Sequence, residues 1–372
     1  MSDSDRSISP AGAPAPAVCV IIPAYGVNAY IADAVDSVLG QTFTDYEVIV
    51  VNDGAPPAET AELRAIMARY GERVRYMEQE NGGQSAARNM AMRATRARLV
   101  AFLDGDDYWA PTLLEREMAL FAADPGLALV YADAWLFGEG PHVGETFMRC
   151  IGDSRGPVTL ESLLVRTVNV TMSTVVARRD AVLGAGAFDE SLRYAEDLEL
   201  WLRMAHAGGR MTYLREPLAY KRLRPTSLSA DSLTMETTVV EVLEEFGRRH
   251  QLSGSSLVAW RESIARARSL LGVTAAKVSL VNGRPANAVE SLQMVRRRDA
   301  SWKLLAAHFG LRTMPVVMSA LYRGWTRLLD ARGRRAVAGP AALGAAIPRP
   351  GAAQPAGPPA HERRAAAPPE SL

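Results

Sequence analysis

The sequence predicts an α/β protein in which a mostly parallel central sheet is flanked by helices. Over about a hundred residues after position 16, short apolar runs alternate with segments of helical periodicity, as in βαβ units. The runs at 18–22 and 99–103 are continuous, which is typical of strands buried on both faces. Polar side chains follow several of the runs, at the edge where open parallel sheets bind ligands.

Each element is predicted from a local pattern and from the residue that bounds it. Pro23 closes the first apolar run, and Gly40 ends a helix whose apolar residues recur at helical spacing. Ser85 is the expected N-cap of a later helix, and Pro111 suits the first turn of another. The predicted strands are 18–22, 47–51, 74–77 and 99–103, and the predicted helices are 28–39, 63–70, 85–96 and 111–121.

Composition divides the chain into four regions. Residues 1–16 are rich in Ser, Ala and Pro and are expected to be a disordered lead, and residues 17–230 hold the predicted α/β domain. Residues 231–335 are mainly helical in pattern. In residues 336–372, Ala, Pro and Gly make up 25 of 37 positions, so we expect a disordered tail that cannot bury enough apolar surface to offset its ordering entropy.

The overall charge and the cysteine count exclude several classes of protein. A formal net charge of +1 gives no overall field of the kind that nucleic-acid binders carry. With only two cysteines, Cys19 and Cys150, a secreted disulfide framework is not expected, and we interpret both as small buried hydrophobes without the sequence neighbours that a reactive thiol needs. The polar N-terminus is unlike a signal peptide and no apolar run approaches about 18 residues, so we expect a cytoplasmic protein.

The segment 102–109 is the most informative strand end. Three carboxylates fall within four residues, Asp104, Asp106 and Asp107, and at a buried edge one of them would be protonated unless a cation neutralised them. Mg²⁺ and Mn²⁺ prefer oxygen ligands and often share one or two carboxylates with substrate phosphates. The alternative is an acidic turn that caps the helix after Pro111. Because a buried strand precedes the acidic residues and a helix start follows them, we favour a site for a divalent metal, Mn²⁺ or Mg²⁺.

Six short segments carry polar groups at the predicted strand ends and near the starts of later elements. They are Val20-Ile-Ile-Pro-Ala-Tyr25, Glu47-Val-Ile-Val-Val-Asn-Asp-Gly54, Asn81-Gly-Gly-Gln-Ser-Ala-Ala-Arg-Asn89, Phe102-Leu-Asp-Gly-Asp-Asp107, Gly186-Ala-Phe-Asp-Glu190 and Glu196-Asp-Leu-Glu-Leu-Trp-Leu-Arg203. As an ordered set over residues 17–230, they resemble the successive motifs of glycosyltransferase family 2. The resemblance implies a GT-A fold, a nucleotide-diphosphate sugar as donor and an inverting displacement at the anomeric carbon.

By position, the resemblance implies roles around the donor. Asp53 would accept a hydrogen bond from the base, most naturally the N3–H of uracil, so a UDP-sugar is the expected donor; the alternative is a turn residue before Gly54. Asp104 would lie near the ribose and the metal, and Asp106 would be the principal metal ligand. The ion neutralises the diphosphate leaving group as negative charge develops on it.

Further residues complete the implied nucleotide-sugar site. Pro23 and Tyr25 follow the first strand, and Arg88 is expected to help position the diphosphate, its alternative being a solvated surface arginine. The family often has a histidine after the sheet, but Arg224 stands at about that place in this chain. We therefore expect Arg222 and Arg224 to pair directly with the diphosphate.

The pair Glu196–Asp197 is implied to supply the general base. An inverting transfer needs a carboxylate that takes the proton of the attacking hydroxyl. An apolar stripe after the pair predicts a helix, which places Asp197 near its N-terminus. Because the helix dipole favours an anion there, we expect Asp197 to be ionised at neutral pH. The alternative is an aspartate that only caps the helix.

The resemblance implies a non-processive transfer in the synthesis of a surface polysaccharide, lipopolysaccharide or glycolipid, with a glycan or a lipid-linked acceptor. The Gln-x-x-Arg-Trp motif of processive synthases is absent. A non-catalytic module that binds a sugar nucleotide is the alternative, against which the acidic motifs argue. A dinucleotide-dependent oxidoreductase needs a Gly-x-Gly-x-x-Gly turn after the first strand, and residues 23–28 do not form one.

The end of the helical region is strongly basic. Residues 296–335 carry ten Lys or Arg and two Asp, and Leu321, Trp325, Leu328 and Leu329 fall on one helical face. Two interpretations stay open. In one, a basic amphipathic helix lies on an anionic membrane surface, at the inner face of the cell membrane. In the other, the helix packs on the catalytic domain and its basic face is solvated.

Overall fold

The computed structural model of the chain describes residues 15–140, 142–151, 154–225, 227, 231–296 and 309–324. The predicted tail, nearly all of the predicted lead, and Trp325 with the two leucines that follow it on the basic helix lie outside the described residues. Within the described ranges, no helix combines the length and the apolar character that crossing a bilayer requires.

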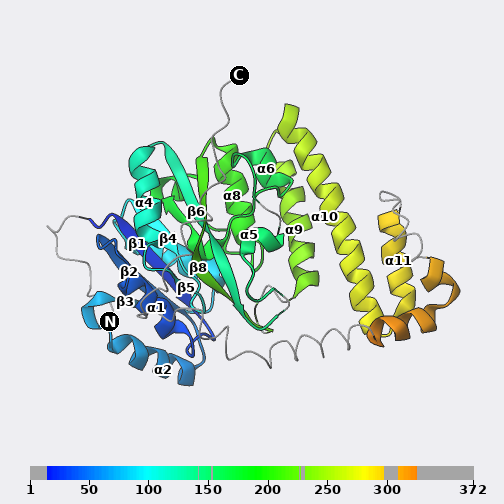
Figure 1. Ribbon diagram of the computed structural model, residues 1–372, viewed down its shortest axis with the longest axis horizontal. Helices are drawn as coiled ribbons and strands as arrows, with labels where there is room; N and C mark the ends of the chain where they lie inside the picture. The colour runs from blue at the N-terminus through cyan, green and yellow to red at the C-terminus, as the bar shows by residue number, and fades with distance from the viewer. Residues whose placement is uncertain are drawn as a thin grey trace, which may run out of the picture.

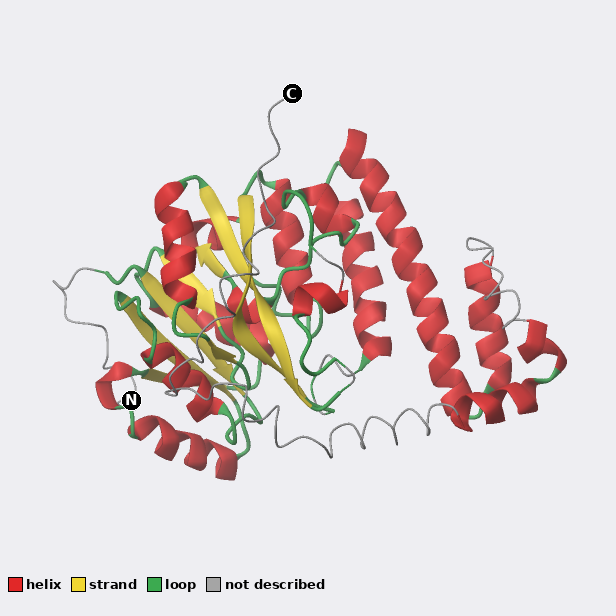
Figure 2. Ribbon diagram, in the orientation of Figure 1, coloured by secondary structure: helices red, strands yellow, loops and turns green. Residues whose placement is uncertain are grey.

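In the part of the chain that the structure describes, an eight-stranded sheet forms the centre of the fold (Figure 1, Figure 2). Its order is β3-β2-β1-β4-β7-β6-β8-β5. Strands β1 to β4 pair in parallel, whereas β7 is antiparallel to both β4 and β6, and β5 is antiparallel to β8. The sheet is therefore parallel in its first half, as predicted, and mixed beyond it. The strands are β1 (Val18–Ala24), β2 (Tyr46–Asp53), β3 (Arg75–Gln79), β4 (Leu99–Phe102), β5 (Tyr108–Trp109), β6 (Leu127–Gly138), β7 (Val176–Arg178) and β8 (Arg210–Leu223).

Two strands extend further toward the predicted site than expected. β1 continues through Pro23, where we expected it to end. Ile21 faces β4, and its carbonyl accepts the N–H of Leu103. Pro23, two residues on, faces the same side, but β4 has already ended at Phe102, so no neighbouring strand needs an N–H from the proline. β2 also runs two residues past its predicted end and finishes on Asp53.

Helices cover both faces of the sheet. Helices α1, α2 and α4 pack on the face that carries Val18, Val20 and Ile22, while α3, α6, α8 and α9 pack on the face that carries Cys19 and Ile21. Because successive side chains of a strand point to opposite faces, fully buried β1 contributes to both cores. The helices are α1 (Ile31–Leu39), α2 (Pro57–Ala68), α3 (Gly83–Ala94), α4 (Leu113–Ala123), α5 (Phe147–Ile151), α6 (Leu160–Leu164), α7 (Arg179–Gly184), α8 (Glu196–His206), α9 (Ser232–Arg249), α10 (Gly254–Val281) and α11 (Pro285–Arg296).

Four predicted helix starts are wrong. Helix α1 begins at Ile31 and not at residue 28, and α4 begins at Leu113, so Pro111 precedes the helix and does not form its first turn. The helix expected to begin after Ser85 begins two residues before it, and the residue that precedes its first turn is Gly82. Ser85 is buried instead, and its hydroxyl lies 3.5 Å from the carbonyl oxygen of Leu192. Helix α2 also begins earlier than expected, at Pro57, because proline is well suited to the first turn of a helix.

The C-terminal helices belong only partly to a separate unit. Helix α9 and the first half of α10 place Val239, Phe246 and Ile264 in the same core as the sheet. The hydroxyl of Ser263 on α10 donates to the carbonyl of Leu164 on α6 at 2.6 Å. The far half of α10 instead packs with α11 in a small core of its own, away from the sheet (Figure 1). The boundary after residue 230 stays a prediction, and the core of the α/β part extends beyond it.

Glu117 on α4 is a buried acid whose carboxylate has no hydrogen-bond partner among the described residues. The side chain is fully buried. Burial raises the pKa of Glu117 well above its ordinary value. The folded-state pKa therefore exceeds that of the unfolded chain. The contribution of this group to stability is present at low pH and is lost as the pH rises through the folded-state pKa.

We expect Glu117→Gln to remove this part of the pH dependence of stability. Glu117→Met, which fills a similar volume without an unpaired polar group, should raise the free energy of unfolding at neutral pH by about 1–3 kcal/mol. Urea unfolding of the parent and both variants at acidic and at alkaline pH measures the two effects. If the parent and the Glu117→Gln variant lose the same stability between the two pH values, the assignment to Glu117 is wrong.

Candidate active site

A cavity of about 800 Å³ lies at the carboxyl ends of the parallel strands. Its walls come from the ends of β1, β2 and β8, the turn after β4, and helices α3, α8 and α9. The structure thus gathers segments that are far apart in the sequence. All ten residues predicted for the site line this cavity, namely Pro23, Tyr25, Asp53, Arg88, Asp104, Asp106, Glu196, Asp197, Arg222 and Arg224.

Asp53 at the end of β2 holds the loop that leads into α3. Its Oδ1 accepts the N–H of Gly82 at 2.8 Å and the Nε2–H of Gln79 at 2.8 Å, and its Oδ2 accepts the N–H of Gly83 at 2.9 Å. A carboxylate offers about four lone-pair directions, so Oδ2 keeps one acceptor position that the described residues do not use. Asp53 is therefore both a loop-ordering residue and an acceptor on the cavity wall.

Gly54 is required by the close approach of this loop. Its φ is +66°, and a Cβ at this position would lie 2.3 Å from the backbone nitrogen of Asn81. The side-chain amide of Asn81 in turn donates to the carbonyl of Asp53 at 3.0 Å. The glycine after Asp53 thus lets two segments of the chain meet beside the cavity.

Arg88 on α3 is a buried cation that connects two parts of the site. Only 1% of its side chain is exposed. Its Nη2 donates to Asp104 Oδ1 at 2.8 Å and to Gln84 Oε1 at 2.7 Å, and its Nη1 donates to Glu196 Oε1 at 2.9 Å. The alternative interpretation of Arg88 as a solvated surface arginine is therefore wrong. In this structure the guanidinium binds protein carboxylates, and the predicted contact with a diphosphate stays a prediction.

We expect Arg88→Met to cost about 3–5 kcal/mol in the free energy of unfolding, because it leaves Asp104 and Glu196 without their shared counter-charge. Arg93→Met is the matched control on the same helix. Its side chain is 63% exposed and lies 3.7 Å from Glu190, so the loss should stay below about 1 kcal/mol. Urea unfolding measures the loss in the free energy of unfolding for both variants. Equal losses would show that Arg88 stabilises the fold no more than the exposed Arg93 does.

Asn89 joins two of the sequence motifs. Its side-chain amide donates to the carbonyl of Phe188 at 2.8 Å, and its Oδ1 accepts the N–H of Phe188 at 3.1 Å. The phenyl ring of Phe188 in turn lies under the guanidinium of Arg88, 5.4 Å from its carbon. This pair of hydrogen bonds fixes α3 to the Gly186–Glu190 segment.

The three aspartates after β4 differ in environment. Burial pushes the pKa of Asp104 up, but Arg88 and Lys221 outweigh it and lower the pKa below its ordinary value. Asp106 pairs with Arg224, at 2.6 Å between Oδ2 and Nη2. Asp107 is 1% exposed, and burial raises its pKa to about 7, against the opposing effect of Lys221. The acidic segment therefore faces three cations, of which Lys221 lies near both Asp104 and Asp107. None of its carboxylates caps α4, which begins after Thr112, so the alternative of a helix-capping turn is wrong.

Lys221 is a site residue that sequence reasoning missed. Its Nζ lies 3.7 Å from Asp107 Oδ2 and 3.9 Å from Asp104 Oδ2, and it lines the cavity. The nearby carboxylates outweigh burial and raise its pKa above the ordinary value, so Lys221 is charged. Its position one residue before Arg222 in a basic run was the available signal.

Arg222 and Arg224 contact the acidic segment through different groups: Arg222 through its backbone N–H and its Nε, and Arg224 through its Nη2. The backbone N–H of Arg222 donates to Asp107 Oδ1 at 2.6 Å, and its Nε donates to the carbonyl of Asp106 at 2.9 Å. Its guanidinium also stacks over the ring of Tyr30, at 4.2 Å from the centroid. Arg222 is thus held by the protein, whereas Arg224 contacts the carboxylate of Asp106 itself.

The carboxylates of Asp104 and Asp106 fit a divalent metal. Both line the cavity and supply the hard oxygen atoms that Mn²⁺ and Mg²⁺ prefer. Such ions are usually bound by one or two carboxylates together with substrate phosphates, so no third protein ligand is required. Asp106 is engaged by Arg224, so ion binding would exchange that arginine for the metal.

Glu196 and Asp197 form the first turn of α8, opposite the acidic segment. The residue before the helix is Ala195, in a left-handed conformation with φ of 54°. Asp197 is therefore not the N-cap, and its Oδ1 accepts the N–H of Leu198 at 2.7 Å. Burial raises the pKa of Asp197, against the opposing Leu198 hydrogen bond, and burial likewise raises the pKa of Glu196 despite Arg88. The shift of Asp197 is opposite to the one expected from the helix dipole.

The mixed sheet, with carboxylates at its edge and an acidic pair on α8, has the architecture of a GT-A fold. Residues 19–141 match the family model described as Glycosyl transferase family 2. Relatives that are named as glycosyltransferases agree with this match, so this segment of the chain is similar to glycosyltransferase family 2.

Three relatives illustrate how far the similarity reaches. The chain is 41% identical over 101 residues to the uncharacterized glycosyltransferase EpsJ of Bacillus subtilis (strain 168), covering 27% of this chain and 29% of EpsJ. It is 28% identical over 198 residues to the uncharacterized glycosyltransferase RP339 of Rickettsia prowazekii (strain Madrid E), covering 50% of this chain and 58% of RP339. It is 29% identical over 241 residues to the putative teichuronic acid biosynthesis glycosyltransferase TuaG of Bacillus subtilis (strain 168), covering 63% of this chain and 90% of TuaG. The chain thus spans less than two thirds of EpsJ and of RP339.

Two solved structures share the fold. Staphylococcus aureus TarS, residues 1–349 in complex with UDP-GlcNAc, has a TM-score of 0.53 at 16% identity, covering 84% of this chain and 91% of that one. The mannosyltransferase PcManGT from Pyrobaculum calidifontis, in complex with GDP-Man and Mn²⁺, has a TM-score of 0.54 at 18% identity, covering 85% and 88%. Since the two bind different bases, the likeness in fold does not select the donor.

Proposed function

We propose that the protein is an inverting, non-processive glycosyltransferase that moves a sugar from a nucleotide diphosphate, most naturally UDP, to an acceptor hydroxyl in the synthesis of a surface polysaccharide, lipopolysaccharide or glycolipid. One observation carries the proposal. A single cavity holds the strand-end carboxylates suited to a nucleotide donor and, across Arg88, the acidic pair suited to deprotonate an acceptor. The names of TuaG and of the two solved structures support it.

On the donor side, Asp104 and Asp106 would hold a divalent ion, which when bound neutralises the charge of the departing diphosphate. Arg224, which pairs with Asp106 in this structure, would then be free to bind a phosphate oxygen, for which arginine is well suited. Lys221 stays with Asp107 and Asp104 and keeps the acidic segment compact.

The base assignment is tested by Asp53→Asn. Asparagine keeps one acceptor oxygen but places an amide donor toward an N–H of the loop, so we expect weaker binding of UDP, by about 10-fold or more, together with a modest loss of thermal stability. Calorimetry with UDP and GDP measures the affinities. Gln79→Ala, which removes one loop contact but leaves the carboxylate, is the control. Unchanged UDP affinity in Asp53→Asn would rule out the uracil contact.

On the acceptor side, Asp197 takes the proton of the attacking hydroxyl. The acceptor oxygen forms its bond to the anomeric carbon from the face opposite the diphosphate, the bond between that carbon and the diphosphate oxygen breaks, and the nucleotide leaves with that oxygen. The configuration inverts because attack and departure occur on opposite faces. A pKa raised by burial makes the ionised Asp197 a stronger base than a solvated aspartate.

The lining of the cavity near α6, α8 and α9 supports a lipid-linked acceptor. Arg166 adds one cation to this part of the wall, which suits the phosphate of such an acceptor. The basic helix, for which membrane binding and packing on the catalytic domain were both left open, reaches outside the described residues, so contact with an anionic membrane and a cytoplasmic location stay predictions. The apolar lining residues are Leu163, Val168, Met172, Leu198, Trp201, Met235 and Val239.

A donor screen tests the proposed function. UDP-, GDP- and dTDP-sugars are incubated with the protein and Mn²⁺, and hydrolysis of the donor is followed by release of the nucleotide diphosphate. We expect hydrolysis of a UDP-sugar that stops in excess EDTA. A protein that binds these donors and hydrolyses none would be the non-catalytic module instead.

A further inference from the structure

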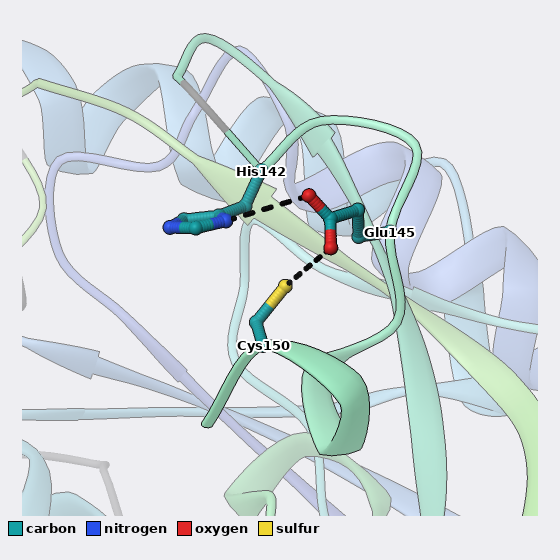
Figure 3. Close-up of side chains that lie close together, drawn as sticks. All are labelled: His142, Glu145 and Cys150. Atoms are coloured by element: carbon teal, nitrogen blue, oxygen red, sulfur yellow. Dashed lines mark hydrogen bonds and ion pairs between the residues drawn. The ribbon is translucent and has the colours of Figure 1, made fainter. Parts of the chain in front are cut away.

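The segment after β6 gathers three metal-ligating side chains outside the cavity. His142, Glu145 and Cys150 converge, and their ligand atoms all lie within 4.8 Å of one another (Figure 3). His142 Nδ1 is 3.6 Å from Glu145 Oε1, and Cys150 Sγ is 3.6 Å from Glu145 Oε2. In the part of the chain that the structure describes, this is the one group of three or more His, Cys, Asp or Glu side chains that meets so closely. Our interpretation of Cys150 as a buried hydrophobe without partners is therefore wrong.

Two separations, each to a different oxygen of Glu145, are close to those of a tetrahedral zinc site, and the ligand atoms of all three residues lie within 4.8 Å of one another. With bonds of about 2.0–2.3 Å, neighbouring ligand atoms around Zn²⁺ lie about 3.3–3.6 Å apart. A thiolate and a carboxylate together with a neutral imidazole supply two negative charges, which balance the ion. Thiolate and imidazole select zinc or cobalt over manganese and magnesium, so this group differs in chemistry from Asp104 and Asp106.

The backbone around the three side chains is held in place. The N–H of Leu136 on β6 donates to the carbonyl of Glu145 at 2.9 Å, and the N–H of Glu145 donates to the carbonyl of His142 at 3.1 Å. The N–H of Cys150, on α5, donates to the carbonyl of Thr146 at 3.1 Å. The group is therefore set by a turn that pairs with β6 and by the first turn of a helix, and not by chance contact of free side chains.

We propose that His142, Glu145 and Cys150 form a zinc site, with water completing the tetrahedron on the exposed side. His142 and Glu145 are 54% and 42% exposed, so an ion can enter from solvent. Phe147, which lies between Glu145 and Cys150 in the sequence, lines the large cavity of the candidate active site. The ion would thus fix the segment that contributes Phe147 to the cavity wall, without taking part in the transfer.

Cobalt substitution tests the site in the full chain. Reduced, metal-free protein is titrated with Co²⁺, and the thiolate-to-cobalt charge-transfer absorption is recorded in the near ultraviolet. We expect the band to saturate at one equivalent and to disappear when Zn²⁺ displaces the cobalt. Cys150→Ser should abolish the band, and His142→Ala should weaken the affinity for Co²⁺ by at least about 10-fold.

Two controls make the result specific. Cys19→Ala removes the other thiol, which is fully buried in β1, and should leave the band unchanged. Asp106→Asn disables the oxygen-rich site and should also leave the band unchanged, so failure here is distinct from failure of the transfer reaction. Absence of the band, its survival in Cys150→Ser, or an unchanged affinity in His142→Ala would overturn the proposal.

Discussion

Asp197→Asn is expected to lower turnover by about 100-fold or more, with little change in donor affinity or melting temperature. The substitution keeps the size of the side chain and an acceptor for the N–H of Leu198, but it removes the basicity. Because Asp197 is not the N-cap of α8, a purely structural role predicts a nearly neutral variant. Single-turnover kinetics with saturating donor, together with calorimetry of donor binding, separate the two roles.

Glu196→Gln is the matched control, one residue earlier on the same helix turn. Glutamine keeps an oxygen that can accept from Arg88, so the variant should fold and should cost less in turnover than Asp197→Asn. If the Glu196→Gln enzyme is the inactive one, the role of base passes to Glu196. Near-normal turnover in Asp197→Asn would leave Asp197 as a structural residue of α8.

Asp106→Ala is expected to abolish measurable transfer and to remove the effect of Mn²⁺ on donor binding. The parent should bind the donor more tightly with Mn²⁺ than with EDTA, since the ion offsets the charge of the diphosphate. In the variant the freed Arg224 can still reach a phosphate, so weak binding that is independent of metal should remain.

Calorimetric titration of the donor into parent and variant, each with Mn²⁺ and with EDTA, checks this expectation. Unfolding in urea provides the control for stability, because the variant also loses the ion pair between Asp106 and Arg224. Full transfer activity in Asp106→Ala, or turnover of the parent that is unchanged in excess EDTA, would show that Asp106 holds no essential ion.

The parts of the fold that were predictable are those with local causes. The apolar runs of β1 and β4 are continuous because both faces of these strands are covered, and this burial is visible in the sequence itself. Asp53, Asp104 and Asp106 were placed at one edge because parallel strands end together. That Glu196 and Asp197 face the same cavity followed only from the family resemblance, since nothing local relates α8 to β4.

Long-range packing decided what the sequence did not show. Lys221 enters the site because β8 pairs with β6 and β5 and brings its basic end to the acidic segment. Cys150 meets His142 and Glu145 through a turn whose shape no periodic pattern encodes. For Asp197, the helix dipole was a correct local argument, but the cost of burial is larger and reverses the direction of the pKa shift.

The sharing of one core between the sheet and α9 has a consequence for how the protein is made. The family motifs end at Arg203, but Met235 and Val239 of α9 are part of the cavity wall. During synthesis from the N-terminus, every residue with a proposed chemical role leaves the ribosome before the helix that closes the cavity around it. The part of the cavity wall that Met235 and Val239 provide is therefore missing until α9 has emerged and folded against α8. A working enclosure for the sugar is among the last features of this chain to form.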